Sequence, residues 1–285
     1  MSKAGVKPHT ADLRSEGRIC ISAMNKNFTV RMEFADSDVR GIAVGSVCNQ
    51  GARNYQEDSF GFAPGKTGAE PKYGFTAVVA DGMGGLSGGA QVSCKVVTSL
   101  LEMQEKRDPS CPVHVHLSRA MQEINSSILE SGMTGGSTAA AVMCLPAGIY
   151  WCTVGDSRVY LFRNKTLALL SEDSDYLNRL IEKVMSGEIT YEEACSDPQK
   201  DALVQYMGYK GGVNPDVNRR PMVPVMNDKL LICSDGVYNA LSNEELSVLL
   251  AEPADKAAEE IEKAVISKGY SNQDNFTAVV LEFIH

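Results

Sequence analysis

An unbroken apolar run that ends in one carboxylate and then in glycines is the feature that most limits the fold of this chain. Residues 75–80 form the run, and Asp81, Gly82, Gly84 and Gly85 follow it. The run is too short for an ordinary helix and predicts a strand buried on both faces. Asp81 would lie where that strand reaches solvent, and the glycines would let the backbone turn sharply. Taken alone, the stretch is better explained as a strand followed by an ordinary Asp-Gly turn, because Asp-Gly is a common turn pair.

The same arrangement returns along the chain. Carboxylates sit at an end of five further predicted strands: Asp235 after 230–233, Asp156 between 150–154 and 158–163, Asp274 before 276–283, and Glu57 with Asp58 before 59–62. Carboxylates at the ends of several buried strands can converge in space. Hard divalent cations such as Mg²⁺ or Mn²⁺ select oxygen ligands of this kind. The pattern therefore predicts a carboxylate cluster that holds metal.

The order of the predicted elements favours an α+β fold. Apolar spacing predicts helices at 89–106 and 115–131 on one face of a sheet, and further helices at 176–185, 189–195, 242–251 and 253–267. Other strands are predicted within 18–34 and at 41–47 and 139–145, and 149–154 is predicted to pair with 158–163 as a hairpin around Asp156. Strands and helices do not alternate strictly, so antiparallel sheets with helices outside fit better than a doubly wound parallel sheet.

Composition and charge exclude several classes of protein. The 285-residue chain carries a net charge of −9, which argues against non-specific nucleic-acid binding. No apolar segment approaches the ~18 residues that span a bilayer, and the polar N-terminus lacks the apolar centre of a signal peptide. We therefore expect a cytoplasmic protein with reduced cysteines, of which Cys94, Cys144, Cys152 and Cys233 lie in apolar runs and are expected to be buried.

No internal repeat or break in composition divides the chain. We expect residues 1–17 to be poorly ordered and 18–285 to form one catalytic domain, with a flap-like segment at 172–216. Within that segment, 198–216 is irregular and carries Lys200, Tyr206, Tyr209 and Lys210. These side chains could meet an acidic phosphoprotein, and an ordinary solvated loop explains them equally well.

Four motifs, in order, resemble those of the metal-dependent Ser/Thr protein phosphatases of the type 2C (PPM) family, in their compact bacterial form. They are Arg53-x-x-x-Glu57-Asp58, Val79 to Gly85, Gly155 to Arg158, and Ser234-Asp235-Gly236 followed by Asp274-Asn275. Gly136-Ser137-Thr138 is a weaker fifth match, and the likeness covers residues 41–283. The resemblance implies a four-layer αββα sandwich, in which two antiparallel sheets are flanked by helices.

The resemblance also implies an activity and a role for each site residue. A hydroxide held on a two-metal centre of Mn²⁺ or Mg²⁺ would hydrolyse phosphoserine and phosphothreonine in proteins, which makes the chain a phosphoric monoester hydrolase. Asp81 would bridge the two metals, and Asp58 and the Gly82 carbonyl would contribute to the same centre. Asp235 and Asp274 would hold the second metal, and Asp156 with Asp235 would form a third metal site. Glu57 would act through metal-bound water, and Arg53 would hold the substrate phosphate. Phosphorylated proteins, a cognate Ser/Thr kinase and a monomeric state are implied in the same way.

Several positions depart from the family pattern. Asp173-Ser174 stands where Asp-His is usual, and Leu86 stands where bacterial relatives often have His. The chain has four histidines, none near a motif, so a Ser-His-Asp or Cys-His mechanism is poorly supported. Cys111, His114 and His116 form a soft-ligand cluster that lacks a fourth ligand nearby.

Two alternative functions remain open at this point. A regulatory or binding protein could keep the fold and lack turnover. A metal-dependent nuclease could share the two-metal chemistry, although it fits the acidic surface poorly. The presence of all the carboxylates together with Arg53 favours the phosphatase.

Overall fold

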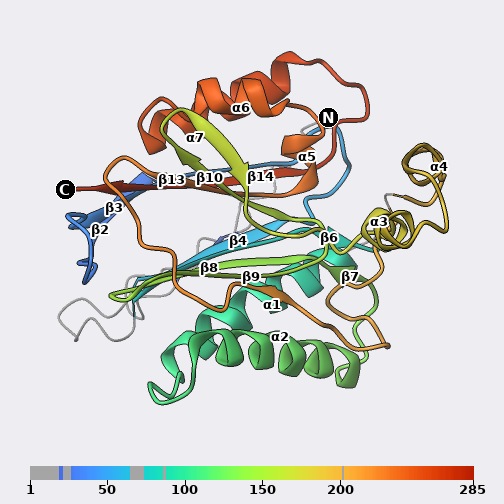
Figure 1. Ribbon diagram of the computed structural model, residues 1–285, viewed down its shortest axis with the longest axis horizontal. Coiled ribbons are helices and arrows are strands. Elements are labelled where there is room, and N and C mark those ends of the chain that lie inside the picture. The colour runs from blue at the N-terminus through green and yellow to red at the C-terminus, as the bar shows by residue number, and fades with distance from the viewer. Residues whose placement is uncertain (1–18, 22–26, 65–73, 86–87, 201) are drawn as a thin grey trace, which may run out of the picture.

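Two six-stranded sheets stack face to face in the centre of the molecule, with helices on both outer sides (Figure 1). The computed structural model describes residues 19–21, 27–64, 74–85, 88–200 and 202–285. Every strand pair in them is antiparallel. The predicted four-layer αββα sandwich is therefore confirmed. The prediction of a poorly ordered N-terminus at 1–17 lies outside the described residues.

The first sheet is built around four central strands whose described residues are almost wholly buried. Its order is β1 (Ile19–Ile21), β4 (Ser59–Pro64), β5 (Phe75–Ala80), β8 (Ala139–Leu145), β9 (Gly148–Val154) and β12 (Asp216–Val217). In the centre of this sheet, Val79 of β5 pairs with Phe60 of β4 and with Ala140 of β8. The apolar run before Asp81 is thus the buried strand that its composition predicts.

The second sheet brings together the end of the chain and its early part. Its order is β11 (Thr166–Leu169), β10 (Arg158–Arg163), β13 (Lys229–Cys233), β14 (Phe276–Ile284), β3 (Gly41–Asn49) and β2 (Asn27–Arg31). A two-stranded ribbon, β6 (Gly82–Met83) with β7 (Gly136–Ser137), extends beyond the first sheet.

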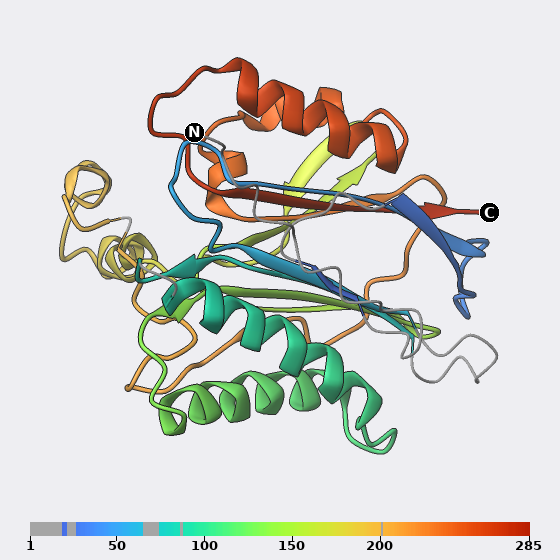
Figure 2. The same ribbon diagram turned by 180° about the vertical axis from the view of Figure 1, so that it is seen from behind.

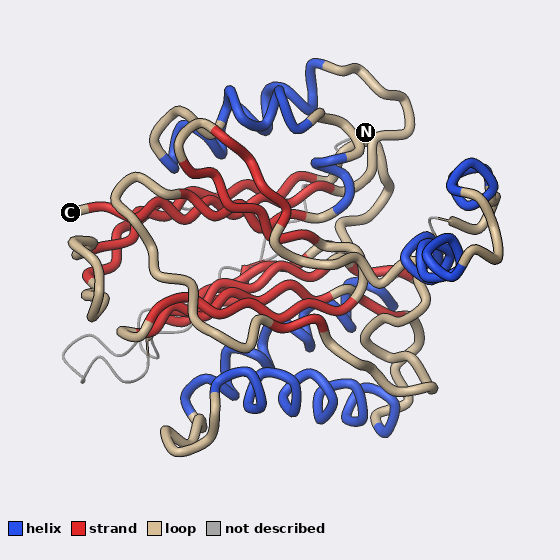
Figure 3. Tube along the Cα trace, viewed as in Figure 1, coloured by secondary structure: helices blue, strands red, loops and turns tan. Residues whose placement is uncertain are grey.

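The helices form the two outer layers and a small projection. α1 (Gly88–Glu105) and α2 (Val113–Glu130) cover the first sheet, and α5 (Asp235–Tyr238), α6 (Asn243–Leu249) and α7 (Ala254–Ser267) cover the second (Figures 2 and 3). α3 (Tyr176–Ser186) and α4 (Tyr191–Ser196) project from one end of the sandwich. The Ser242 capping box at the start of α6 forms as its sequence indicates: Ser242 N donates to Glu245 Oε2 over 2.9 Å. No helix in the described ranges is both long enough and apolar enough to cross a bilayer.

Three apolar clusters hold the layers together. One lies between the sheets and includes Phe60, Phe62, Ile232 and Phe283, all fully buried. A second packs the first sheet on α1 and α2, and a third packs the second sheet on α6 and α7. Strands buried on both faces are apolar throughout because each face meets one of these clusters. Among the cysteines expected in the core, three are buried, whereas Cys94 on α1 is exposed.

The predicted hairpin around Asp156 is wrong. β9 pairs with β8 and β12 in the first sheet, whereas β10 pairs with β11 and β13 in the second. Residues 155–157 carry the chain from one sheet to the other. A run of apolar residues predicts that a strand is buried, but it does not predict which sheet the strand joins. The consequence for the site is large, because this crossing brings Asp156 to the seam between the two sheets.

Candidate active site

A pocket of about 540 Å³ opens where the strand ends of both sheets meet. Its walls include seven of the eight predicted site residues: Arg53, Glu57, Asp81, Gly82, Asp156, Asp235 and Asp274. The eighth, Asp58, is 1% exposed and lies within reach of the charges of Asp235 and Asp274. The structure therefore brings the whole predicted set together. Gly84, Gly85 and Met83 of the glycine-rich stretch also line the pocket.

Asp81 is fixed by its own backbone. Its N–H donates to Thr138 Oγ1 over 2.9 Å, and Thr138 N–H donates to its carbonyl over 2.8 Å. Thr138 Oγ1 lies 2.6 Å from Ser157 Oγ, at the crossing between the sheets. Thr138, quoted above only as part of the weak fifth motif, thus joins the central carboxylate to the corner that carries Asp156.

Asp58 is held by two buried hydroxyl groups from the second sheet. Ser234 Oγ donates to Asp58 Oδ2 over 2.8 Å, and Thr277 Oγ1 donates to the same oxygen over 2.7 Å. Asp58 directly precedes β4 of the first sheet, so these bonds tie the two sheets together at the site. The role of Thr277 was not predicted, because a threonine within an apolar strand carries no signal of its own.

Arg53 lies at the mouth of the pocket and contacts Asp274. Its Nη2 is 2.6 Å from Asp274 Oδ2, and its side chain is 57% exposed. The loop that carries it is fastened by Asn275, whose Oδ1 accepts from Glu57 N over 2.8 Å. Asn275 Nδ2 donates to the carbonyls of Gln50 and Tyr55 over 2.8 and 2.9 Å.

The start of the predicted flap-like segment contacts the corner that carries Asp156, behind the pocket lining. Asp173 forms a two-pronged ion pair with Arg158, with Nη2–Oδ2 at 2.7 Å. The guanidinium carbon of Arg158 lies 3.7 Å from the ring centroid of Tyr238. Tyr238 Oη in turn donates to the Asp156 carbonyl over 3.1 Å. Asp173, which keeps the Asp of the usual Asp-His pair, therefore supports the corner of Asp156 from outside the pocket.

Burial and mutual repulsion raise the pKa of four carboxyl groups at the site. Burial raises the pKa of Asp58 to about 7 and that of Asp156 to about 7. For Asp81, burial and then the charges of Asp58, Asp235 and Asp156 raise the pKa well above its ordinary range. Burial, followed by the charge of Asp274, raises the pKa of Asp235. Such a cluster stays ionised at neutral pH only if cations neutralise it.

Unpaired oxygens give an independent test of whether the residues fit metal. Glu57 Oε1, Asp58 Oδ1 and Asp235 Oδ1 are buried and have no hydrogen-bond partner. Buried acceptors of this kind are rare unless an ion or water satisfies them. Within the described ranges, however, no group of three or more His, Cys, Asp and Glu side chains stands ready to hold an ion by itself. The carboxylates fit hard cations once Asp274 is released from Arg53 and a backbone oxygen such as that of Gly82 takes part.

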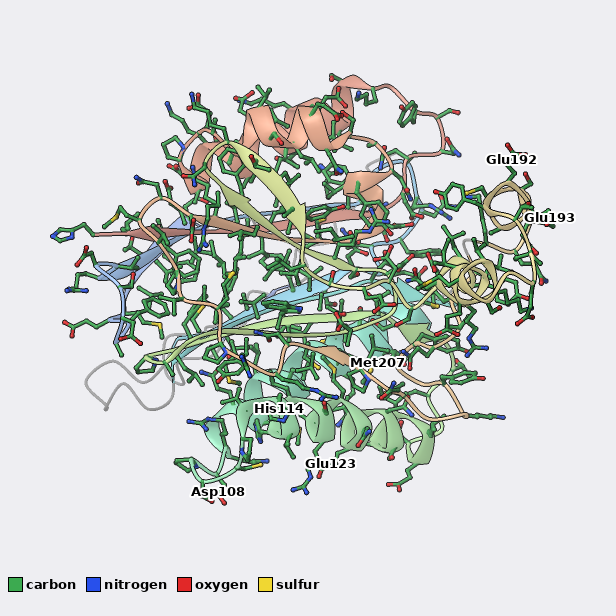
Figure 4. The ribbon with its side chains drawn as sticks, in the orientation of Figure 1. Asp108, His114, Glu123, Glu192, Glu193 and Met207 are labelled. Carbon is green, nitrogen blue, oxygen red and sulfur yellow. The ribbon has the colours of Figure 1, made fainter. Side chains whose placement is uncertain are left out.

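The soft-ligand residues do not form a second site. Cys111, His114 and His116 belong to no potential metal-binding group in the described part of the chain. His114 lies on α2, under the first sheet (Figure 4). Desolvation lowers the pKa of His116.

Sequence reasoning missed several residues of the pocket. Asn54, Tyr55 and Leu203 line it, and Leu203 comes from the flap-like segment. Tyr55 is 56% exposed, an unusual position for a large ring. No periodicity marks these three, because they lie in loops whose course depends on the tertiary contacts described above.

Comparisons with known proteins agree with this geometry. A family model described as Protein phosphatase 2C matches residues 54–268. The serine/threonine phosphatase Stp of Listeria welshimeri is 31% identical over 249 residues, which cover 81% of this chain and 91% of that protein. The solved serine/threonine phosphatase of S. agalactiae superposes with a TM-score of 0.71 at 26% identity, covering 86% of this chain and all of that one.

A further solved structure shares the fold. The catalytic domain of the phosphatase PstP in complex with two manganese ions superposes with a TM-score of 0.62 at 22% identity, covering 86% of this chain and 99% of that one.

Proposed function

The chain belongs to the protein phosphatase 2C family, and we propose that it is a metal-dependent protein-serine/threonine phosphatase. The reaction adds water across the P–O bond of phosphoserine or phosphothreonine. The water oxygen bonds to phosphorus, and the side-chain oxygen leaves with a proton as the alcohol, together with inorganic phosphate. The single observation that carries the proposal is the convergence of the motif carboxylates and Arg53 on one pocket from both sheets.

Two ions of Mn²⁺ or Mg²⁺, the ions that this family uses, fit the donor set. Asp81, Asp58 and the Gly82 carbonyl would hold one ion, and Asp81, Asp235 and Asp274 would hold the other. When bound, such ions act as Lewis acids that activate water for attack on phosphorus and neutralise the developing charge. We assign Asp156, with Asp235, to a third ion.

The other side chains orient the substrate and the water. Arg53 is exposed at the pocket mouth, so its guanidinium can turn from Asp274 to a phosphate, which is also an anion and can accept two parallel hydrogen bonds from it. Asp274 would be free to hold an ion once Arg53 has turned away. Glu57 has a buried oxygen without a partner, which places an acceptor for a water proton in the pocket wall.

The substrates that we propose are phosphorylated proteins, with a cognate Ser/Thr kinase that adds the phosphate. We also propose that the chain acts as a cytoplasmic monomer in which 18–285 forms the catalytic domain. The segment 172–216 would then serve as a flap over the pocket. Its connection through Leu203 and through the Arg158–Asp173 pair supports this assignment.

Turnover of p-nitrophenyl phosphate tests the proposal against the regulatory alternative. With Mn²⁺ the protein should release p-nitrophenol, and EDTA should stop the reaction. Asp81→Asn should reduce kcat/KM by about a thousandfold, because loss of metal charge stabilisation amounts to several kcal/mol. Asp255→Asn, in the first turn of α7 and outside the pocket, is the matched control and should leave the rate unchanged.

Calorimetry separates the two functions if turnover is absent. If the wild type binds Mn²⁺ and Asp81→Asn does not, the assignment of the metal centre is supported even without turnover. A wild type that neither binds Mn²⁺ nor turns over substrate would favour a regulatory protein that retains the fold.

A further inference from the structure

A second pocket, of about 550 Å³, lies beside the proposed active site. We call it the tyrosine pocket. Its lining combines apolar side chains with polar backbone and one cation: Leu129, Gly132, Met133, Gly135, Tyr206, Gly208, Tyr209 and Lys210. Leu129 and Tyr209 are 36% and 37% exposed, so their apolar surfaces are open to a partner. The Lys210 side chain is exposed at the rim.

The walls of the tyrosine pocket are already fixed. The rings of Tyr206 and Tyr209 lie 5.6 Å apart between centroids. The Tyr206 ring lies against Gly136, where a Cβ would come within 2.5 Å of the ring. Asn125 of α2 holds the turn between the rings: its Oδ1 accepts from Gly208 N over 2.6 Å and its Nδ2 donates to the Tyr209 carbonyl over 3.1 Å. A preformed pocket binds a side chain without a further ordering cost.

The backbone joins the tyrosine pocket directly to the active site. Gly82 of β6 pairs with Ser137 of β7. On the other side of β7, Ser137 exchanges two hydrogen bonds with Met207, of 3.1 and 2.7 Å. Figure 4 shows Met207 between the first sheet and α2. Gly82, Ser137 and Met207 therefore lie in a row, and strands are spaced by about 4.8 Å, so Met207 is about 10 Å from the active-site wall.

An extended polypeptide can bridge this distance with few residues. Each residue of an extended chain advances about 3.4 Å, so a separation of about 10 Å corresponds to roughly three residues. A substrate chain whose phosphorylated residue sits in the active site can thus place a nearby side chain in the tyrosine pocket.

We propose that the tyrosine pocket recognises the substrate polypeptide two to four residues from its phosphorylated residue. The occupant is an aromatic or aliphatic side chain held between Tyr209 and Leu129, with a neighbouring carboxylate paired to Lys210. The lining chemistry argues for this occupant: two rings and two aliphatic side chains surround it, with one exposed ammonium at the edge. The proposal rests on the phosphatase function proposed above.

Two series of phosphopeptides test the proposal. In the first, Phe replaces Ala at each position within four residues of phosphothreonine, and kcat/KM is measured by phosphate release. We expect about a tenfold preference at one position two to four residues away, because one apolar group in a pocket is worth about tenfold or more. The preference should appear in KM, since the contact lies away from the reacting atoms. The second series places Glu or Lys next to the preferred Phe.

Variants locate the preference in the tyrosine pocket. Leu129→Trp fills the pocket and Tyr209→Ala removes a wall, so both should abolish the Phe preference. Lys210→Glu should reverse the preference for Glu over Lys. Tyr191→Ala on α4 and Lys165→Glu in the β10–β11 turn are the matched controls, because both residues are exposed and lie outside either pocket.

Turnover of p-nitrophenyl phosphate separates the two proposals, since this small ester cannot reach the tyrosine pocket. Full turnover by every variant, with the Phe preference lost only in Leu129→Trp and Tyr209→Ala and the Glu preference reversed only in Lys210→Glu, supports the inference. A flat peptide scan, or a preference unchanged in those variants, overturns it and leaves the phosphatase function standing. Absence of p-nitrophenyl phosphate turnover in the wild type overturns both.

Discussion

Asn275 fastens the loop that carries Arg53 and Glu57 with one side chain. It accepts one backbone hydrogen bond and donates two, and it is 5% exposed. Glu57 and Arg53 reach the pocket from a stretch without regular structure, so their positions depend on this amide. The sequence marks Asn275 only as the partner of Asp274 in a motif, because an amide's hydrogen bonds cannot be read from its neighbours in the chain.

We predict that Asn275→Asp lowers kcat/KM by about 10- to 100-fold. The new carboxylate cannot donate hydrogen bonds to the carbonyls of Gln50 and Tyr55, so the loop moves and displaces Arg53 and Glu57 from the reacting phosphate. Asn218 supplies a matched control: its side chain also accepts one backbone bond, from Trp151, and donates two, to Ile149 and Arg220. Asn218→Asp should destabilise comparably, by about 2 kcal/mol, and retain the rate. Urea unfolding and p-nitrophenyl phosphate kinetics on both variants check this, and equal rates in the two would refute the role of Asn275.

At the scale of the elements, the sequence predicts most strands and helices, and it predicts their partners less well. Val92, Val96 and Leu100 recur at helical spacing and do face the core in α1. β11 and β12 were not foreseen: β11 is short and largely exposed, and β12 has two residues. Pairing depends on residues far apart in the chain, which is why β9 and β10 look like a hairpin in the sequence and lie in different sheets in the structure.

The crossing between the sheets gives an element-scale prediction. Gly155 has φ of +95°, and a Cβ there would lie 2.7 Å from Thr138 Cγ2. Gly155→Ala should therefore displace Thr138, which holds Asp81, and lower both stability and rate; we expect a loss of about 2–4 kcal/mol and more than tenfold in kcat/KM.

Gly187→Ala is the control for that strain. Gly187 has φ of +78°, and a Cβ added there would meet nothing within 4 Å, so its substitution tests backbone strain alone. It should cost about 1 kcal/mol and leave turnover unchanged. If Gly155→Ala behaves in the same way in chemical denaturation and in the rate assay, the contact with Thr138 does not position Asp81.

At the scale of the whole molecule, the site is a seam between two sheets. Asp58, Asp81 and Asp156 come from strand ends of the first sheet, whereas Asp235 and Asp274 come from the second. The same stacking that buries the apolar core thus presses like charges together. The sequence predicts that the carboxylates cluster; it cannot predict their burial, which depends on how the sheets stack.

Burial of these carboxylates should make the stability of the metal-free protein fall as pH rises. The pKa of Asp58 and of Asp156 is about 7 in the folded protein, against about 4 in the unfolded chain. Between these values the folded state binds more protons than the unfolded state, so the free energy of unfolding decreases with rising pH. The stabilisation is complete below about pH 4 and is lost as pH passes through 7.

Thermal unfolding in EDTA between pH 5 and pH 8 measures this effect. The wild type should be least stable at pH 8. Mn²⁺ should restore the most stability at that pH, because the ions bind the folded state and neutralise the carboxylates in place of the lost protons. Asp156→Asn removes one of the buried charges, so in EDTA it should exceed the wild type by about 4 kcal/mol at pH 8 and match it near pH 4. If the variant is less stable than the wild type by the same amount at every pH, the Asp156 side chain stabilises the crossing at residues 155–157. Charge repulsion between the two sheets then does not determine how stability depends on pH.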